Sequence, residues 1–425
     1  MLLTSNFKEL SFLVYGLGLS GQSVVKFFEK KNIKNYKVWD DKKKNLFRNK
    51  RTKNLNKTLL NVDYIILSPG ISLVKEKNLI RFKKKIITDI DLLYLTNKNF
   101  KSIVVTGTNG KSTTCKLITH LLKKKKFKVL LGGNIGTPIL DLKIKKNSYI
   151  VIEASSFQLS HSKFIYPDYA FLLNITNDHL DWHGNKQNYI NSKFKIFQNQ
   201  KKHHFALVNS KFIKSFKKKL LKSKLVVPEI KNYKRIKHKI KNQYLQATIN
   251  DENMSFVHAF SKLLKISEKY FIQTLNSFVG LPHRYEIFLK RKNAVFINDS
   301  KATSFISTKH ALANSENIYW ILGGQAKKND KIILSGVKKK IIRCYLIGKE
   351  LDFFKYQIKG KINFSISHNL KKALIDIFKD IKLSALKNNT ILLSPAAASF
   401  DQFKNFEKRG EEFKKLSRLY ARKYI

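Results

Sequence analysis

The chain has 425 residues, and hydrophobic residues make up 43% of it, which is enough for several domains with buried cores. Its formal charge of +55 suggests a nucleic-acid or membrane-surface function, but only ten of the 84 basic residues are arginine. The lysines are spread along the whole chain, and abundant Lys, Asn, Ile, Phe and Tyr fit an A/T-rich coding bias. Two cysteines exclude a disulfide framework, and no run of about 18 apolar residues occurs. We therefore expect a cytoplasmic protein with no specific nucleic-acid partner and no membrane insertion.

The N-terminal residues predict a nucleotide-binding βαβ unit. A strand at 11–15 leads into the G-x-G-x-x-G turn at 16–21, a helix at 22–29 and a second strand at 36–39 that ends at Asp40. This pattern indicates a phosphate or nucleotide at the end of a strand, without specifying which one. A further strand at 62–67 ends in the tight turn 68–70.

The segment 103–114 predicts a phosphate-binding loop. A run of β-branched residues ends in a glycine-rich turn, and Lys111-Ser112-Thr113 then opens a helix. Glycines let backbone N–H groups approach an anion, and the N-terminus of the helix adds partial positive charge. We expect Lys111 to reach the terminal phosphates of a nucleotide and Ser112 to hold Mg²⁺. The loop is a short form of G-x-x-x-x-G-K-[ST], because position 105 is valine.

Alternating strands and helices around this loop predict a mostly parallel sheet with helices on both faces. The expected strands of this unit are 102–106, 128–132, 149–153, 170–174 and 205–208. The lysine-rich stretch 210–242 has little periodicity and predicts peripheral loops or hairpins, with helices following at 250–264 and 267–277. After turn residues at 280–284, a third α/β unit is expected to have strands at 294–298, 318–322, 342–347 and 390–394 and a closing helix at 401–422.

Acidic and histidine residues follow two strands of the second unit. Glu153 ends the strand 149–153, in the same sheet as the phosphate loop, and suits Mg²⁺. The segment 174–184 contains His179 and His183 at the i, i+4 spacing of a zinc pair. No third nitrogen or sulfur ligand is near in the sequence, so Mg²⁺ bound by oxygens and a single histidine is favoured over zinc. In the third unit, three polar, small-residue segments at 298–303, 322–327 and 394–403 follow strands and predict an anion-receiving corner.

Taken together, residues 14–413 resemble the Mur ligases, most closely the members that add D-glutamate. The resemblance implies an α/β protein of three domains. These are an N-terminal Rossmann-like domain (1–97) for a UDP-linked substrate, a central P-loop ATPase-type parallel-sheet domain (98–280) for ATP, and a C-terminal Rossmann-like domain (281–425) for the amino acid. It also implies a monomeric, ATP-dependent ligase of peptidoglycan precursor synthesis. Such an enzyme joins D-glutamate to UDP-N-acetylmuramoyl-L-alanine through an acyl phosphate, with two Mg²⁺ ions and closure of the domains.

The resemblance assigns roles to the positions that match the family's motifs. Those matching contacts to the UDP-linked substrate are Leu19, Ser20, Asp40, Asp41, Lys42, Ser68, Gly70, Asn134 and Ser155. Those matching the ATP site are Gly107, Thr108, Asn109, Gly110, Lys111, Ser112, Thr113, Asn253, Arg284 and Asp299. Those matching D-glutamate contacts are Lys301, Thr303, Lys327, Ser399 and Phe406. The implied catalytic residues are Lys111, Glu153, His179 and Lys193. The implied metal ligands are Ser112, Glu153, His179 and, once carbamylated, Lys193.

Two positions depart from the family's pattern, and three other functions compete with this one. Lys42 stands where arginine is common, and Ile249 replaces the histidine of a His-Asn-x-x-Asn motif, which puts details of adenine binding in question. Ligases of the folylpolyglutamate synthase type lack the N-terminal unit. A nucleic-acid-stimulated P-loop ATPase would ignore D-glutamate. An NAD enzyme would leave Lys111, Glu153 and Lys193 without a role.

Overall fold

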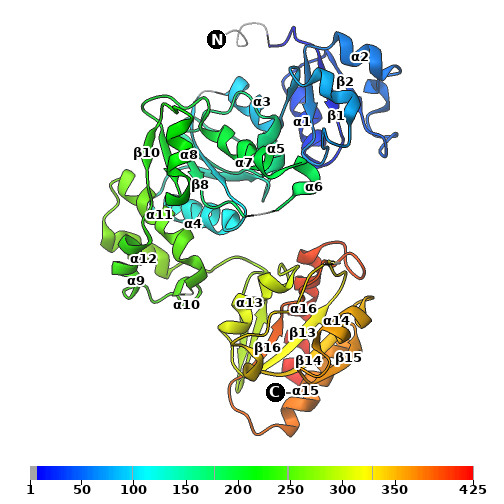
Figure 1. The fold of residues 1–425 in the computed structure, drawn as a ribbon, viewed down its shortest axis with the longest axis vertical. Helices are drawn as coiled ribbons and strands as arrows, with labels where there is room; N and C mark the ends of the chain where they lie inside the picture. The colour runs from blue at the N-terminus through cyan, green and yellow to red at the C-terminus, as the bar shows by residue number, and fades with distance from the viewer. Residues whose placement is uncertain (1–6, 98, 177, 247, 328, 425) are drawn as a thin grey trace. The chain divides into compact units, whose positions relative to one another are not determined.

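The computed structural model describes residues 7–97, 99–176, 178–246, 248–327 and 329–424. Asn177, in the predicted acidic and histidine segment, and residue 98, where the central domain is predicted to begin, lie outside the described residues. The chain forms two compact units, one ending at Phe278 and the other beginning at Val279 (Figure 1). The division into domains 1–97, 98–280 and 281–425 stays a prediction, although the chain does form three sheets.

The first sheet of the N-terminal unit is parallel, with strand order β2-β1-β3-β4. Its strands are β1 (Phe12–Tyr15), β2 (Tyr36–Trp39), β3 (Tyr64–Leu67) and β4 (Ile86–Ile87). Its helical segments are α1 (Leu19–Lys30), η1 (Arg48–Lys50), α2 (Leu55–Asn61), η2 (Lys77–Phe82) and α3 (Asp89–Thr96). Helix α1 begins at Leu19, three residues before the predicted start and within the predicted glycine turn 16–21, so its N-terminus follows closely on the end of β1.

The second sheet is also parallel, with order β10-β9-β8-β5-β7-β6. Its strands are β5 (Phe100–Thr106), β6 (Val129–Gly133), β7 (Ser148–Glu153), β8 (Tyr169–Leu172), β9 (Phe205–Val208) and β10 (Lys224–Val226). The helices of this part are α4 (Lys111–Lys124), α5 (Ser156–His161), α6 (Leu180–His183), α7 (Lys186–Phe194), α8 (Ile213–Lys218), α9 (Ile230–Lys237), α10 (Gln243–Gln246), α11 (Asp251–Leu263) and α12 (Glu268–Asn276).

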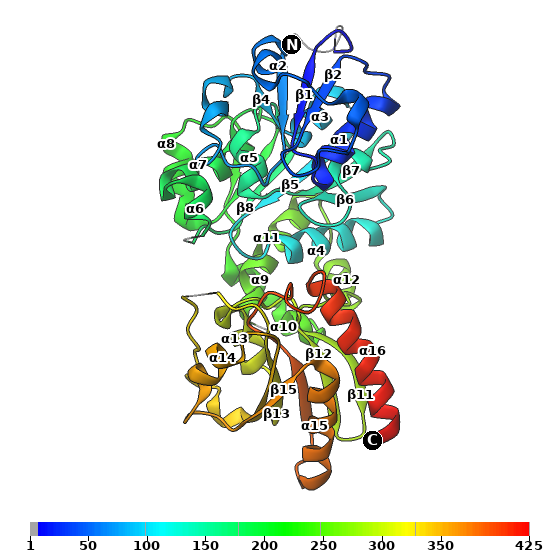
Figure 2. The ribbon, with the colours of Figure 1, turned by 90° about the vertical axis from the view of Figure 1, so that its right-hand side faces the viewer.

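Helices cover both faces of the second sheet, as the alternation of elements predicted. Alternate residues of β5 point to opposite faces, so Val105 packs in one apolar cluster and Val104 in the other. The first cluster takes in α4, α11 and α12, and Figure 2 shows α4 and α11 on that side of β5. The second cluster includes α7 and also Ile90 and Leu93 of α3. Helix α3 therefore joins the N-terminal sheet to the central one.

The expectation of loops over 210–242 is wrong. This stretch contains α8, α9 and the edge strand β10, which pairs in parallel with β9. Phe216, Tyr233 and Ile236 are buried in the core, while the intervening lysines stay exposed. A helix can pack on the core with only a few apolar side chains, and among so many lysines their helical periodicity is hard to recognise in the sequence.

The second unit contains a six-stranded sheet of order β11-β12-β16-β13-β14-β15. Its strands are β11 (Glu286–Arg291), β12 (Ala294–Asn298), β13 (Ile318–Gly323), β14 (Ile341–Ile347), β15 (Phe364–His368) and β16 (Asn389–Leu393), and its helices are α13 (Phe305–Ala313), α14 (Leu351–Ile358), α15 (Leu370–Leu383) and α16 (Phe406–Tyr424). All pairs are parallel except the antiparallel edge pair of β11 and β12. The predicted α/β class is therefore confirmed, with a mixed third sheet. Among the described residues, no helix is long and apolar enough to cross a membrane.

Two details of the second unit differ from expectation. Strands β11 and β15 were not predicted, because each is only partly buried and lacks a continuous apolar run. The closing helix begins at Phe406 rather than at residue 401. The amide of Phe403 donates to the carbonyl of Ser399, which makes a turn, and the Asn405 side chain then accepts from the amide of Lys408. Such an acceptor marks the true start of the helix.

Candidate active site

Three neighbouring strands end together around the predicted phosphate loop. Strand β5 lies between β7 and β8, with Val105 opposite Glu153 and Thr106 opposite Leu172. The loop 107–110 that follows β5 is therefore flanked by Glu153 on one side and by Asn174, which follows β8, on the other. The carboxyl ends of parallel strands are where ligands bind in open α/β sheets.

The glycines of the loop are required by its close neighbours. Gly110 has φ of +82°, and a Cβ there would overlap Oδ1 of Asn253 on α11. At Gly107 a Cβ would lie 3.0 Å from the Cβ of Leu173. The structure thus brings Asn253, a predicted ATP contact, against the loop.

The first half of the loop is tied to the end of β8. The amide of Thr108 donates to the Asn174 carbonyl at 2.9 Å, and the amide of Asn109 donates to Oδ1 of Asn174 at 2.8 Å. Ser112 and Thr113 are buried in the first turn of α4. The N-terminus of α4, with its unsatisfied N–H groups, is therefore the part of the cradle suited to an anion.

Lys111 folds back over the loop that precedes it. Its ammonium donates to the carbonyls of Gly107 at 2.8 Å and Thr108 at 2.9 Å. The positive charge is thus held at the mouth of the loop, where the predicted phosphates would lie.

Lys193 contacts the same carbonyl of the loop as Lys111. It projects from α7 and is only 1% exposed, and its Nζ donates to the Gly107 carbonyl at 2.9 Å. Nζ also lies 4.6 Å from the centre of the Tyr189 ring, one turn earlier on α7, and the Tyr189 hydroxyl bonds Oγ1 of Thr108 at 2.8 Å. Burial and the nearby Lys111 charge hold the pKa of Lys193 well below its usual range, against the opposing pull of Asp178.

Glu153 has one satisfied and one unsatisfied oxygen. The side chain is 2% exposed, and Oε1 accepts from Nδ2 of Asn134 at 2.8 Å. Its Oε2 is buried and has no hydrogen-bond partner in the structure as described. A buried carboxylate oxygen without a partner is costly, so this oxygen suits a bound cation. The structure thereby brings two predicted residues, Glu153 and Asn134, into direct contact.

His179 lies immediately before α6, in the left-handed conformation with φ of +52°. Its Nε2 is 3.3 Å from Oδ2 of Asp178, and its ring lies 4.7 Å from that of Phe157. Burial lowers the pKa of His179, and the charges of Lys111 and Lys193 lower it further, while Asp178 opposes them. A neutral imidazole is the form that binds a metal.

The geometry does not support a zinc pair. Nε2 of His183 is bonded to Oγ of Ser156 at 3.0 Å, and the His183 ring is buried among aromatic side chains. Within the described ranges, no three His, Cys, Asp or Glu side chains are grouped to hold a metal. A cation at this site would have to use hydroxyl, phosphate or modified-lysine oxygens beside Glu153 and His179.

The glycine turn of the N-terminal domain is closed by Ser68, whose Oγ donates to the Gly16 carbonyl at 2.7 Å. Leu19 is 80% exposed at the start of α1, and Ser20 bonds the buried Asp89 carboxylate. At Gly70 a Cβ would meet open space. These predicted residues therefore lie around one accessible turn.

The Asp40 carboxylate accepts hydrogen bonds from backbone amides of the protein itself. Its two oxygens accept from the amides of Leu17 at 2.6 Å, Lys42 at 2.9 Å and Lys43 at 2.8 Å. Burial acts to raise the pKa of Asp40, but these amides outweigh it and lower the pKa. Asp41 accepts from the Trp39 indole at 3.1 Å. Asp40 therefore shapes the loop, and the exposed Lys42 is better placed to meet a ligand.

Ser155 caps α5 by accepting from the Gln158 amide.

In the second unit, Asp299 follows β12 and is 8% exposed. Its Oδ2 accepts from Oγ of Ser394 at 2.7 Å, and its Oδ1 accepts from the amide of Tyr285 at 3.1 Å. Burial raises the pKa of Asp299 to about 7, although these donors and the Arg284 charge oppose the rise. The structure thus brings together Arg284 and Asp299, both of which were predicted to contact ATP.

The remaining predicted residues of this unit lie in loops and at the start of α16. Nζ of Lys301 is 4.8 Å from the Phe406 ring centre, and Gln325 bridges to Ala398 beside the buried Ser399. Thr303 is half-buried and Lys327 is exposed. The structure thus brings Lys301 and Phe406 into direct contact.

Comparison with known proteins places this geometry in a family. Residues 10–88 match the family described as "Mur ligase MurD-like, N-terminal domain", and residues 105–272 match "Mur ligase middle domain". A Rickettsia felis protein named UDP-N-acetylmuramoylalanine--D-glutamate ligase is 38% identical over 96% of this chain and 97% of its own length. A protein of the same name from Buchnera aphidicola is also 38% identical, over 97% of this chain and 99% of its own. This chain belongs to the Mur ligase family.

Solved structures of Mur ligases share the fold. MurC from Thermotoga maritima aligns with a TM-score of 0.58 at 17% identity, covering 97% of this chain and 100% of its own. MurF from the same organism, solved with ADP, aligns with a TM-score of 0.57 at 16% identity, covering 99% and 97%.

Several residues of this Mur ligase's site had no predicted role. Asn174 bonds both the loop and Oε2 of Glu252, whose Oε1 accepts from Asn209 at 2.6 Å. Buried Arg409 donates to Ser300 and to the carbonyls of Ala397 and Ala398. The only signals in the sequence were the place of Asn174 after a predicted strand and of Arg409 within the predicted closing helix 401–422. Neither signal predicts which residues Asn174 and Arg409 contact.

Proposed function

We propose that this Mur ligase joins D-glutamate to UDP-N-acetylmuramoyl-L-alanine, with ATP converted to ADP and phosphate, as a step of peptidoglycan precursor synthesis. One observation supports it best: the phosphate loop is flanked by a buried carboxylate, Glu153, and a buried lysine, Lys193, in a chain colinear with the named D-glutamate ligases.

The reaction has to make an amide from a carboxylate, which is a poor electrophile. Transfer of the γ-phosphoryl group of ATP to the substrate carboxylate gives an acyl phosphate. The amine of D-glutamate then attacks its carbonyl carbon, and phosphate leaves. Phosphoryl transfer depends mainly on positioning and charge neutralisation. In this chain the N-terminus of α4 and Lys111 would bind the phosphates, and Asn253 would hold the nucleotide against the loop.

Mg²⁺ fits the residues present. Oε2 of Glu153, which has no hydrogen-bond partner among the described residues, is a hard anionic ligand. Ser112 lies at the start of α4, and the lowered pKa of His179 favours the neutral imidazole that binds metals. When bound, the ion would neutralise charge that develops on the phosphates. Glu153 and His179 would hold two ions together with Ser112 and a modified Lys193.

The environment of Lys193 suits carbamylation. The neutral amine attacks the carbon of CO₂, an N–C bond forms, and one proton leaves the nitrogen, which yields a carbamate anion. Burial and the Lys111 charge lower the pKa of Lys193, which favours the neutral amine that this attack requires. The product would replace an isolated buried amine with an anionic oxygen ligand beside the loop.

The UDP-linked substrate is assigned to the predicted N-terminal and central domains, and D-glutamate to the predicted C-terminal domain. The turn of Leu19, Ser20, Ser68 and Gly70, with Lys42, would hold the UDP part, and Asn134 and Ser155 would hold the muramoyl part. Lys301, Thr303, Lys327, Ser399 and Phe406 would bind D-glutamate, with Arg284 and Asp299 completing the ATP site. Because these residues belong to separate domains, closure of the domains in a monomer would precede the chemistry.

Phosphate release tests the proposal. The purified protein is assayed with ATP, Mg²⁺, UDP-N-acetylmuramoyl-L-alanine and D-glutamate, and each component is omitted in turn. We expect full dependence on all of them. Phosphate release that needs DNA or RNA and ignores D-glutamate would replace the proposal with a nucleic-acid-stimulated ATPase.

A further inference from the structure

A cavity of about 300 Å³ lies behind the candidate active site, within the first unit. Its walls come from the segment that follows β3, from the end of α5, from α6 and from α7. None of the residues predicted to bind a substrate or a metal lines it. Its volume lies at the lower end of the range for small-molecule sites.

Two buried nitrogen atoms in the cavity wall lack a partner. His161 is 8% exposed, and its Nε2 has no hydrogen-bond partner among the described residues; the same holds for the indole Nε1 of Trp182. Leaving a buried polar group unsatisfied costs about 1–3 kcal/mol. An acceptor atom in the cavity would satisfy the Trp182 N–H and, in the tautomer protonated at Nε2, also His161.

The charge of the wall favours an anion. Lys83 and Lys195 line the cavity, and no described lining residue is acidic. The Lys195 ammonium already donates to the carbonyls of Ser160 and Ser162, so the exposed Lys83 is the cation more available to a ligand. The nearby Asp91 carboxylate is engaged by Ser162 and by the amides of Lys163 and Phe164. Leu73 and Val74 supply an apolar wall. The occupant should therefore combine a negative charge with a small apolar body.

We propose that this cavity binds a small organic carboxylate. The site is joined to the candidate active site through α7, because Asn188 and Ser192 line the cavity while Tyr189 and Lys193 contact the phosphate loop. The Trp182 ring also packs on Phe157, which contacts His179. An occupant would touch residues 73–74 and α7 at once, and so would link the N-terminal domain to the helix beneath the loop.

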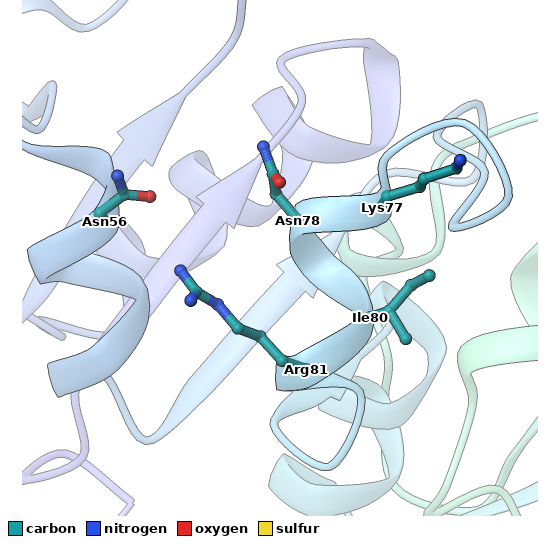
Figure 3. A pocket seen from close by; sticks show the side chains of 5 residues that line it. All are labelled: Asn56, Lys77, Asn78, Ile80 and Arg81. Carbon is teal, nitrogen blue, oxygen red and sulfur yellow. The ribbon is translucent and has the colours of Figure 1, made fainter.

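Another hollow of the first unit has no such groups. It measures about 540 Å³ and lies between α2 and η2, where the side chains of Asn56, Lys77, Asn78, Ile80 and Arg81 line it (Figure 3). All five of these residues are exposed, so water satisfies their polar atoms. It carries no proposal.

Calorimetric titration of the full chain tests the site. The titration is done at about 0.3 M salt, which limits electrostatic attraction to a few ångströms and so suppresses nonspecific binding to the basic surface. The probes are benzoate, its neutral isostere benzamide, and inorganic phosphate. We expect benzoate to bind at least about tenfold more tightly than benzamide or phosphate. Equal binding of benzoate and benzamide, or binding of phosphate alone, would overturn the proposal.

Variants distinguish specific binding of benzoate in the cavity from nonspecific attraction of the anion to the basic surface. Lys83→Gln should weaken benzoate binding by about fivefold, the effect of one exposed charge that lines the cavity. Lys84→Gln, an equally exposed neighbour outside the cavity, should change it less than about twofold. Val74→Trp, which fills the cavity, should abolish binding. Equal losses in the two lysine variants, or binding that survives Val74→Trp, would contradict a built site.

Discussion

The buried ammonium of Lys193 on α7 donates to the carbonyl oxygen of Gly107, at the start of the phosphate loop, over 2.9 Å. The contact joins a helix more than 80 residues downstream to the loop, and it involves a lysine whose pKa is held low by burial and by Lys111. A buried lysine with a lowered pKa beside a phosphate site can have a chemical role or a packing role, and the two roles make different predictions.

If Lys193 is a carbamylated metal ligand, Lys193→Ala should lower ligase activity by at least about 100-fold, the loss of some 3 kcal/mol of transition-state stabilisation. Added acetate or formate should restore part of it, because a free carboxylate can occupy the vacated space. Lys186→Ala, on an exposed position of the same helix, is the matched control and should retain activity. Loss without rescue by any short acid would indicate a packing role.

Gly110 should tolerate no side chain. Its φ of +82° disfavours other residues, and a Cβ would overlap Asn253. We expect Gly110→Ala to cost about 1–2 kcal/mol of stability and to raise the Kd for ADP by at least about tenfold. Gly18→Ala, where a Cβ meets nothing within 4 Å, is the control and should leave ADP binding unchanged. Similar ADP affinity in both variants would show that the loop does not bind the nucleotide.

Asn174 should position the loop, since it accepts from the Asn109 amide and also bonds Glu252. Asn174→Ala should raise the KM for ATP by about five- to tenfold, corresponding to one lost hydrogen bond of about 1 kcal/mol. Asn209→Ala removes the other Glu252 contact without touching the loop, so its KM should stay within about twofold. If both variants lose stability alike and neither changes KM, the network is only structural.

Asp299 should make the stability of the second unit depend on pH. Burial raises its pKa to about 7, well above the ordinary value of an aspartate, so the folded state binds a proton that the unfolded state releases. The contribution is present below about pH 4 and is lost as the pH rises to about 7, so the free energy of unfolding should fall over this window. Asp299→Asn should flatten that slope. The measurement is urea unfolding followed by Trp320 fluorescence in a variant with Trp39 and Trp182 replaced by Phe.

Arg409 should hold the proposed D-glutamate loops in place. It is 1% exposed, and its guanidinium donates to Ser300, Ala397 and Ala398. Arg409→Lys, which lacks the planar fork, should destabilise the second unit by about 3 kcal/mol and raise the KM for D-glutamate more than that for ATP. Arg422→Lys, exposed on the same helix, should change neither value. Equal effects on both KM values would reduce Arg409 to a general stabilising role.

Much of the architecture was predictable because it follows local rules. The strands 36–39, 205–208 and 294–298 were placed with their observed bounds, since each is a short apolar run between turn residues. The loops around Gly107 and Gly16 were identifiable because glycine is needed where backbone approaches backbone. The helices α8 and α9 were missed because a lysine-rich sequence conceals the few buried side chains that dock them, which are Phe216 of α8 and Tyr233 and Ile236 of α9.

Residue types at fixed short spacings were enough to predict the α/β class, the phosphate loop and the candidate residues. The folded structure was needed to show which basic residues are buried, that one oxygen of Glu153 has no hydrogen-bond partner among the described residues, and that the Asp40 carboxylate accepts from backbone amides. Burial and partner choice depend on segments far apart in the chain, such as α7 against the turn after β5. Their free energies come from desolvation and contact, which no local pattern encodes.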